Sequence, residues 1–288
     1  MISSYALSQR ALVDWSPEVW PSDRYEGALV LPPKSGFYRD VHVMDVGAMY
    51  PNIMIDCNIS IETVRSIDHA IRGWSQQNAD AYALTQDQIR TSKALRETRV
   101  PWSDFAIVVV ADGMMSLISR SKQGAVVNVL RHLIASRKAV RKSTPKGWAF
   151  KIATNSIYGA LGASTSKLQC YQGAGAVTAC GRVITSLAST VSEALGFEVI
   201  YGDTDLAFVS PKHHSSQVLG PSGLLTILHR ILDFTPFGSI RLEHEKTYSS
   251  FISIKHKMYY GTKLSQSDVN IREVKGVAAA RKDHIPII

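Results

Sequence analysis

Residues 199–209 restrict the fold of this chain more than any other stretch. They read Val-Ile-Tyr-Gly-Asp-Thr-Asp-Leu-Ala-Phe-Val, so two apolar, β-prone runs flank a short polar centre that contains a glycine. This pattern predicts a strand, a tight turn and a second strand. Asp203 and Asp205 therefore stand two residues apart at the predicted turn.

Asp203 and Asp205 point to a metal site. Carboxylates this close repel each other unless a cation lies between them. Their hard oxygen atoms suit Mg²⁺, which takes few protein ligands and keeps room for water and phosphate oxygens. The stretch therefore predicts a Mg²⁺ site, and the alternative is a hydrated hairpin turn that is rich in aspartate.

Composition fits an ordinary globular protein and favours a polyanionic partner. The 288 residues allow one or two domains, with 45% hydrophobic and 19% charged residues. The formal net charge of +8 favours binding to a polyanion such as nucleic acid. A generally basic protein without that role would show the same charge, so the charge alone leaves both interpretations open.

The cysteines and the apolar runs argue against several classes of protein. Cys57, Cys170 and Cys180 form no Cys-x-x-Cys pair, so we expect neither a zinc or iron–sulfur site nor a disulfide framework. The first residues have no signal-peptide pattern, and the longest apolar run, Phe105–Ala111, is too short for a membrane span. We therefore expect an intracellular protein without a membrane partner.

Another carboxylate, Asp45, ends an apolar stretch earlier in the chain. Residues 25–31 and 41–45 read as strands separated by a turn that is rich in proline and glycine. A carboxylate at a strand end is well placed to face a cleft. The alternative is an ordinary helix N-cap. Residues 1–24 read as a lead-in segment without identifiable chemistry.

Two predicted helices carry a dense set of basic residues. Residues 113–142 read as a long helical region and residues 148–158 as a second helix, with a break at 143–147. Arg137 and Arg141 are four residues apart, so on a helix they share one face.

Lys151, Asn155 and Tyr158 share a face of the second predicted helix, because they lie at positions i, i+4 and i+7. Together with Arg137 and Arg141, Lys151 and Asn155 suggest a clamp for a triphosphate. The alternative is a pair of basic helices whose charges face water.

The rest of the chain alternates between helix and strand patterns. An apolar stripe predicts a helix over 177–195, and a shorter pattern predicts one over 224–232. Residues 240–248 and 251–257 read as two strands of a hairpin, and residues 271–283 as a basic closing segment.

Five segments taken together resemble the motifs of family B DNA polymerases. The segments are Asp45-Val46-Gly47-Ala48-Met49-Tyr50-Pro51; Lys151-x-x-x-Asn155-Ser156-x-Tyr158-Gly159; Tyr201-Gly202-Asp203-Thr204-Asp205; Lys257-Met258-Tyr259; and Lys275-Gly276 with Arg281-Lys282-Asp283. They occur in the family's order, and the resemblance runs from about Tyr25 to Asp283. One such motif is weakly specific, whereas five in order are highly specific.

The resemblance implies an α+β fold with an antiparallel palm sheet packed on helices and an inserted helical hairpin, the fingers. After the lead-in segment 1–24, we expect the first part of the palm over 25–112, the fingers over 113–162 and the second part of the palm over 163–288.

The resemblance also implies template-directed addition of dNTPs to a primer 3′ end. Asp45 and Asp205 would bridge two Mg²⁺ ions, for which Mn²⁺ could substitute, and the Val46 carbonyl would be a further ligand beside the nucleotide. Asp203 would be a secondary ligand or a tuning carboxylate. Lys151 would hold the triphosphate and protonate the leaving pyrophosphate.

Further roles follow from the same resemblance. Tyr50 would lie under the deoxyribose and Tyr158 behind the nascent base pair. The residues expected on the triphosphate are Arg137, Arg141, Lys151 and Asn155, and those expected on the primer DNA are Lys257, Tyr259, Lys275 and Arg281. Glu243 and Glu245 are additional acidic candidates near the metal site.

The sequence departs from the family pattern in two motif positions and in the regions it matches. Ala48 and Leu206 each replace a serine. The family's exonuclease and thumb regions are not among the matched motifs, so we expect palm and fingers without proofreading.

Two alternatives remain: an inactive subunit that binds primer–template, or one half of a split enzyme whose partner chain supplies the missing parts. A metal-dependent nuclease that uses the same carboxylates is disfavoured, because the family's exonuclease motifs are not in this chain. Any of these would act inside a cell, in cytoplasm, nucleoid or nucleus, or in a host cell if viral.

Overall fold

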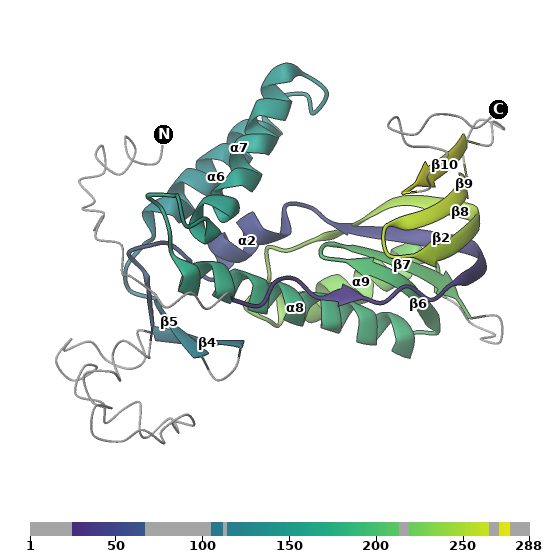
Figure 1. Cartoon of the computed structure of the whole chain (residues 1–288), viewed down its shortest axis with the longest axis horizontal. Helices are drawn as coiled ribbons and strands as arrows, with labels where there is room; N and C mark the ends of the chain where they lie inside the picture. Colours follow the sequence, from purple (N-terminus) through teal and green to yellow (C-terminus); the bar gives the residue numbers. More distant parts are fainter. Residues whose placement is uncertain (1–24, 67–104, 112–113, 213–218, 265–270, 277–288) are drawn as a thin grey trace. The chain divides into compact units, whose positions relative to one another are not determined.

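The structure, a computed structural model, describes residues 25–66, 105–111, 114–212, 219–264 and 271–276 (Figure 1). The expected lead-in segment 1–24 lies outside these residues. The chain divides into two compact units, one of residues 1–27 with 48–180 and the other of residues 28–47 with 181–288.

The second unit is built on a seven-stranded sheet in the order β1-β6-β7-β2-β8-β9-β10. Every pair of neighbouring strands is antiparallel. The strands are β1 (Val30–Leu31), β2 (Gly36–Val46), β6 (Phe197–Asp203), β7 (Leu206–Pro211), β8 (Leu242–Lys255), β9 (Met258–Lys263) and β10 (Ile271–Lys275). The strand–turn–strand prediction for residues 199–209 is confirmed as the β6–β7 hairpin.

One face of this sheet carries an aromatic cluster. Its buried members are Val41, Val43, Ile200, Tyr201, Phe208, Tyr248 and Phe251, and the partly buried Tyr38, Leu206 and Tyr259 pack against them. Alternate residues of a strand point to the same face, so Val41 and Val43 of β2 both reach this cluster. The cluster lies next to the end of β2 where Asp45 stands.

Helices lie along the sheet in the second unit. Figure 1 shows α9 (Pro221–Asp233) and the C-terminal half of α8 (Tyr171–Ala194) beside the strands. The helix α9 buries Leu224, Leu228 and Leu232, which are four residues apart and therefore form one apolar stripe. This stripe is the physical reason that the segment folds as a helix against the sheet.

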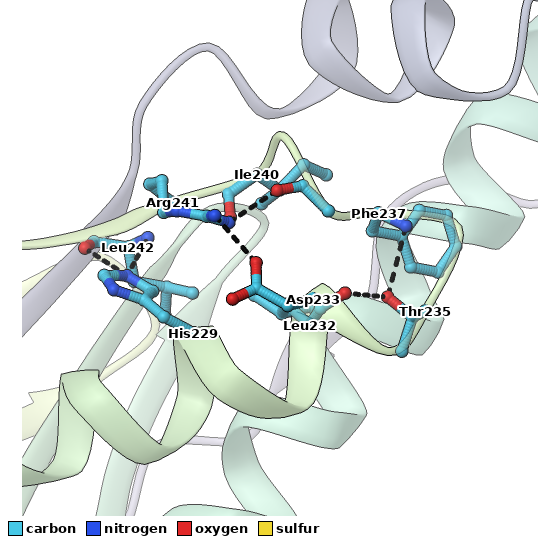
Figure 2. A network of polar contacts seen from close by, with 9 residues as sticks. His229, Leu232, Asp233, Thr235, Phe237, Ile240, Arg241 and Leu242 are labelled. Carbon is cyan, nitrogen blue, oxygen red and sulfur yellow. Dashed lines mark hydrogen bonds and ion pairs between the residues drawn. The ribbon is translucent and has the colours of Figure 1, made fainter.

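A polar network joins the end of α9 to the start of β8 (Figure 2). The His229 Nε2 atom lies 3.0 Å from the Leu242 carbonyl oxygen and 3.1 Å from the Leu242 nitrogen. Arg241 donates to the Asp233 carboxylate at 2.7 Å and to the Gly238 carbonyl oxygen at 2.6 Å. These bonds satisfy backbone groups beyond the helix end. They fix the position at which β8 begins beside β2.

The strand β8 corrects a prediction. Residues 240–248 and 251–257 were expected to form a hairpin, but Leu242–Lys255 is one strand of 14 residues that forms a hairpin with β9. Ser249 and Ser250, which separate the two predicted strands, lie at a register shift in the β8–β9 ladder, where the Ser249 hydroxyl donates to the Thr262 carbonyl oxygen at 3.2 Å. A bulge keeps a polar residue in a strand without ending it.

The first unit contains α2 (Met49–Asp56), a three-stranded sheet and two helices that form a hairpin. The sheet has the order β3-β5-β4, with β3 (Val64–Ser66), β4 (Phe105–Ala111) and β5 (Met114–Ser119). The helices are α6 (Ala125–Lys138) and α7 (Pro145–Gly162), which lie side by side in Figure 1.

The strand β5 and the short α6 correct a second prediction. Residues 113–142 were expected to be one helical region, but residues 114–119 pair with β3 and β4, and α6 begins only at Ala125. Short apolar runs do not distinguish helix from strand by their spacing. The decisive partner of β5 is β4, whose run of Ile107, Val108, Val109 and Val110 favours a strand.

The helix α8 is the one described helix that is long and apolar enough to cross a membrane. Its most apolar stretch is 56% buried inside the protein. Its apolar side chains are therefore accounted for by the core, as in a central helix of a globular domain. The α+β class that the sequence predicted, with an antiparallel sheet and helices, is confirmed.

Candidate active site

Three carboxylates lie in one row across the sheet of the second unit. On β7, Leu206 is paired with Asp203 of β6 on one side and with Asp45 of β2 on the other. Asp45 is paired in turn with Glu243 of β8. Residues directly opposite each other on antiparallel strands have adjacent side chains on one face. The sheet therefore gathers Asp45, Asp203 and Glu243 on the same face, and Glu243 joins the two aspartates as an acidic neighbour.

Asp205 lies in the turn between β6 and β7. Its carbonyl oxygen accepts a hydrogen bond of 2.9 Å from the Val46 N–H, and its own N–H donates to the Asp203 carbonyl oxygen at 2.7 Å. The first bond holds the turn against the end of β2, beside Asp45. The structure thus brings together all four residues that were expected to hold metal ions.

The backbone of this turn is strained, and a hydrogen bond from α8 holds it in place. Thr204 has a φ of 60°, in the left-handed region that costs a non-glycine residue roughly 1 kcal/mol. A positive φ within an i→i+2 hydrogen bond is the pattern of a γ-turn, which is rare. The Thr185 hydroxyl of α8 donates to the Thr204 carbonyl oxygen at 2.9 Å. This contact helps to fix the direction in which Asp205 leaves the turn.

The chemistry of the donor set suits Mg²⁺. Carboxylate and carbonyl oxygens are hard ligands, and Mg²⁺ keeps several waters or substrate oxygens in its shell. Within the described ranges, no three His, Cys, Asp or Glu side chains are arranged to hold a metal ion by themselves. An ion held by Asp45, Asp205 and the Val46 carbonyl would have to complete its shell from substrate and solvent.

Asp203 is held by a network that reaches the β8–β9 turn. Its Oδ2 atom accepts from the Tyr201 hydroxyl at 3.2 Å and lies 3.5 Å from Lys257 Nζ, while the Thr204 hydroxyl donates to Oδ1 at 3.4 Å. The Tyr201 hydroxyl also accepts from the Lys257 N–H at 3.3 Å and lies 3.4 Å from His256 Nδ1.

Burial, reinforced by the negative charge of Asp203, raises the pKa of Tyr201 to about 12, so its hydroxyl keeps its proton at neutral pH. Tyr201 therefore remains a donor to Asp203. Lys257, expected at the primer, is also a partner of Asp203, and its φ of 57° shapes the tight turn in which it lies. Local sequence patterns do not predict this contact, because the two residues lie on separate motifs.

The two departures from the family motifs have different surroundings. Leu206 is partly buried and packs against the aromatic cluster, so an apolar side chain extends that cluster into the carboxylate row. Ala48 precedes α2 with φ 51° and ψ 49°, and no side chain caps the helix. Neither residue removes an oxygen ligand from the candidate metal site.

In the first unit, the two tyrosines expected near the nucleoside lie against each other. The ring centroids of Tyr50 on α2 and Tyr158 on α7 are 4.3 Å apart. The Tyr158 and Tyr25 hydroxyl oxygens are 3.4 Å apart, and burial together with this hydrogen bond raises the pKa of Tyr158. Tyr25 was missed, because 133 residues separate it from Tyr158 and no local pattern links them.

The hairpin of α6 and α7 carries the residues expected on the triphosphate. Lys151 and Asn155, which were expected to share a face of this helix, are both exposed residues of α7. Arg137 lies in the last turn of α6, but Arg141 lies in the segment that connects the helices. The prediction that Arg137 and Arg141 share a helix face is therefore wrong, since α6 ends at Lys138.

The connecting segment is tied to the start of α7. The Thr144 hydroxyl donates to the Arg141 carbonyl oxygen at 2.8 Å and accepts from the Gly147 N–H at 3.1 Å, which makes Thr144 the N-cap of α7. Pro145 at the first helical position favours the helix start. These contacts hold the backbone of Arg141 beside the first turn of α7, although its side chain is exposed.

The hairpin cations form no ion pair within the part of the chain that the structure describes. Residues 113–180 contain ten Lys and Arg residues and no Asp or Glu. None of the ion pairs among the described residues includes a cation of α6, α7 or their connection. The Nζ atom of Lys151 lies over an indole, 5.2 Å from the Trp148 ring centroid.

The residues expected at the primer lie around a different cluster. Lys275 of β10 lies 3.8 Å from the Glu273 carboxylate, and Tyr259 of β9 packs against the aromatic cluster. Burial raises the pKa of Tyr259 to about 12. Arg281 lies outside the described residues.

Glu273 gathers three lysines and a tyrosine, which we name the glutamate cluster. Its carboxylate lies 2.8 Å from Lys263 Nζ, 3.3 Å from Lys246 Nζ and 3.8 Å from Lys275 Nζ, and it accepts from the Tyr248 hydroxyl at 3.0 Å. Burial opposes ionisation, but the lysines and the tyrosine prevail and lower the pKa of Glu273 to about 2. The cluster binds β8, β9 and β10 together.

Comparisons with known proteins show which family this chain resembles. A sequence profile described as DNA polymerase family B matches residues 5–288. The DNA polymerase delta catalytic subunit of Drosophila melanogaster is 27% identical over 92% of this chain and 24% of its own length. The DNA polymerase of Archaeoglobus fulgidus is 28% identical over 91% of this chain and 29% of its own length.

A solved structure gives the same result. The family B DNA polymerase from Pyrobaculum calidifontis matches with a TM-score of 0.60 and 25% identity, over 96% of this chain and 32% of that protein. The chain thus spans about a quarter to a third of the length of these relatives. Because the profile covers nearly every residue, from 5 to 288, this chain belongs to DNA polymerase family B.

Proposed function

We propose that this chain performs template-directed DNA synthesis, adding dNTPs to a primer 3′ end. The observation that carries the proposal is the row of carboxylates on β2 and β6 together with Asp205 in the adjoining turn. Nucleotidyl transfer needs little covalent help from a protein, because positioning and neutralisation of charge supply most of the catalysis. Membership of the polymerase family supports this reaction over other uses of a Mg²⁺ site.

Asp45 and Asp205 are the proposed ligands of two Mg²⁺ ions, with the Val46 carbonyl as a further ligand. When bound, these ions would lower the pKa of the primer 3′-hydroxyl and neutralise charge on the phosphates. Asp203, already bonded to Tyr201 and close to Lys257, would adjust the charge beside the site.

Arg137, Arg141 and Lys151 would hold the triphosphate, with Asn155 supporting Lys151. As the α-phosphorus accepts the primer oxygen and the bond to pyrophosphate breaks, Lys151 would give a proton to the leaving oxygen. The absence of acidic residues from 113–180 supports this role, because no carboxylate of that stretch competes with phosphate. The Tyr50–Tyr158 pair supports a contact with the nucleoside, since two aromatic rings in tilted contact present a rigid surface.

Lys257, Tyr259, Lys275 and Arg281 would contact primer DNA, and the process would take place inside cells, where primed templates occur. A second chain that supplies thumb and exonuclease functions is compatible with the proposal, because the chemistry would still depend on Asp45 and Asp205.

Primer extension tests the proposal. The purified chain, Mg²⁺ and four dNTPs are combined with a primed template, and Asp205→Asn is compared with Asp40→Asn. Asp40 lies exposed on the same strand as Asp45 with a φ of 49°, which asparagine also tolerates, so this control removes one charge without touching the row.

We expect extension by the wild type and by Asp40→Asn, and a loss of about a thousandfold or more in Asp205→Asn. Retained extension by Asp205→Asn would contradict the metal assignment. If the wild type is inactive and a cell extract restores extension that still depends on Asp205, a partner chain completes the enzyme. If no addition restores it, the chain is an inactive primer–template-binding subunit.

A further inference from the structure

The tip of the α6–α7 hairpin, residues 137–148, holds more cations than the proposed triphosphate contacts use. Arg137 and Arg141 are assigned to the triphosphate, which leaves Lys138, Lys142 and Lys146. All three are exposed, and no ion pair among the described residues includes them. Six cations within 15 residues, from Arg137 to Lys151, repel one another unless a polyanion lies over them.

The backbone of the tip is ordered by its own contacts. Besides the bonds of Thr144, Gly147 lies so close to the Arg141 carbonyl that an added Cβ would collide with it. The connecting segment is therefore packed onto the first turn of α7. Figure 1 shows this connection at the end of the hairpin remote from α2. Lys142, Lys146 and Trp148 are thus presented from one compact piece of backbone.

Trp148 has no place in the core. Its side chain is 54% exposed, whereas α7 buries Gly147, Thr154, Ile157 and Leu161 on its other side. Ile152, one turn further along the same exposed side, is 63% exposed. An exposed indole next to an ammonium group, the Nζ of Lys151 at 5.2 Å, is the kind of surface on which a planar ring stacks.

Proteins bind single-stranded nucleic acid with cations that contact the phosphates of its backbone and with exposed aromatic rings on which its bases stack. Phosphate alone would explain the lysines but not the tryptophan, and an acidic peptide would need no stacking surface. We propose that the hairpin tip is a binding site for single-stranded nucleic acid, in which Lys138, Lys142 and Lys146 contact phosphates and a base stacks on Trp148.

This site is separate from the proposed chemistry. It requires neither dNTP nor Mg²⁺, so it can be measured without either. In a polymerase it would give the template strand a second contact in addition to those near the primer end.

The first test measures binding of a fluorescent oligothymidylate to the full chain, by anisotropy, over a range of salt concentrations without Mg²⁺. Changing Lys138, Lys142 and Lys146 together to Gln is compared with changing Lys122, Lys167 and Arg230 to Gln, which are exposed cations outside the tip. Each lost phosphate contact reduces the slope of log K against log salt by about 0.7, so the tip variant should lose about 2.

The control variant should keep the slope of the wild type. Equal losses in the two variants would overturn the proposal, because binding would then follow total charge. An oligothymidylate that fails to bind the wild type would overturn it as well.

The second test concerns Trp148. Trp148→Phe keeps a stacking ring, whereas Trp148→Leu keeps only an apolar side chain. We expect affinity for the oligothymidylate to fall about tenfold in Trp148→Leu and much less in Trp148→Phe. Equal affinity in the two variants would remove the stacked base from the proposal.

The third test separates this proposal from the catalytic one. Asp205→Asn should bind the oligothymidylate as the wild type does while it loses extension. The triple lysine variant should extend a primer normally when the template overhang is one nucleotide, and should show a raised Kd for templates with a long single-stranded overhang. A defect that is equal on both templates would place the lysines in nucleotide binding instead and overturn the proposal.

Discussion

The hairpin of α6 and α7 and the strands β8 to β10 are both rich in cations, but the two sets have different surroundings. On the strands, Lys246, Lys263 and Lys275 all lie within 4 Å of one carboxylate, that of Glu273. On the hairpin, the cations have no carboxylate partner among the described residues, and the sequence from 113 to 180 contains none.

The difference indicates different roles. A half-buried ion pair that is also hydrogen-bonded helps to hold strands together, at a cost in freedom of the lysine side chains. Exposed cations without partners contribute little to folding and remain available for phosphate. We therefore expect the glutamate cluster to act mainly on stability and the hairpin cations mainly on substrate binding.

Among changes to the hairpin and to the strands β8 to β10, we expect the largest effect on activity for the arginines of the hairpin. Arg137→Gln and Arg141→Gln should each raise the KM for dNTP about 10- to 100-fold, since a hydrogen bond to a charged group is worth about 1.5–3 kcal/mol. Thermal melting should stay within about 1 °C of the wild type. Steady-state incorporation of one nucleotide checks this, and a drop in Tm with an unchanged KM would assign these arginines to the fold.

Glu273→Gln should have the opposite signature. It leaves the ammonium groups of Lys246 and Lys263 without their common counterion, and we expect a loss of about 2 kcal/mol in the free energy of unfolding. Urea denaturation at neutral pH measures it. A variant that unfolds at the same urea concentration as the wild type would show that the glutamate cluster does not contribute to the free energy of unfolding.

The pH dependence of stability should report the same carboxylate. The pKa of Glu273 is lowered to about 2 in the folded chain, against about 4.3 when unfolded, so its contribution is complete above about pH 4.5. Stability is lost as pH falls from there toward 2, because the unfolded chain takes up the proton first. Glu273→Gln should therefore flatten the acid limb of the unfolding curve, and an unchanged limb would contradict the assignment.

The smallest effect should come from an exposed pair on the sheet. Lys34 and Glu198 are 3.2 Å apart, with side chains 49% and 37% exposed. Water screens such a pair, so Lys34→Gln should cost below about 0.5 kcal/mol. If urea denaturation shows that Lys34→Gln and Glu273→Gln lose the same free energy of unfolding, burial does not explain the difference between the exposed pair and the glutamate cluster.

Local patterns predicted the parts of the site that lie within one motif. The β6–β7 turn with Asp203 and Asp205, and the exposed side of α7 with Lys151 and Asn155, both follow from short-range spacing. The row that joins Asp203 to Asp45 follows from strand pairing across more than 150 residues. The family resemblance supplied this link, whereas the spacing of residues could not.

Contacts between distant segments account for what sequence reasoning missed. Lys257 approaches Asp203 because the β8–β9 turn folds back to Tyr201, and Glu273 gathers lysines from two other strands. The strand β5 was read as helix because the spacing of apolar residues in so short a run fits a helix as well as a strand. Its pairing with β4 makes it a strand. Arg141 was expected on the first helix of the hairpin. Instead α6 ends at Lys138, and Arg141 lies in the turn before Thr144, the N-cap of α7.

One paired measurement tests the central contrast most directly. Lys151→Gln and Lys263→Gln make the same chemical change on the hairpin and in the glutamate cluster, and each variant is examined by single-nucleotide incorporation with dNTP titration and by thermal melting. We expect at least about a tenfold loss of kcat/KM in Lys151→Gln with an unchanged Tm. In Lys263→Gln we expect a Tm lower by about 3 °C, with kcat/KM within about twofold of the wild type. A lower Tm in Lys151→Gln and a loss of kcat/KM in Lys263→Gln would contradict the assignment of the two lysines.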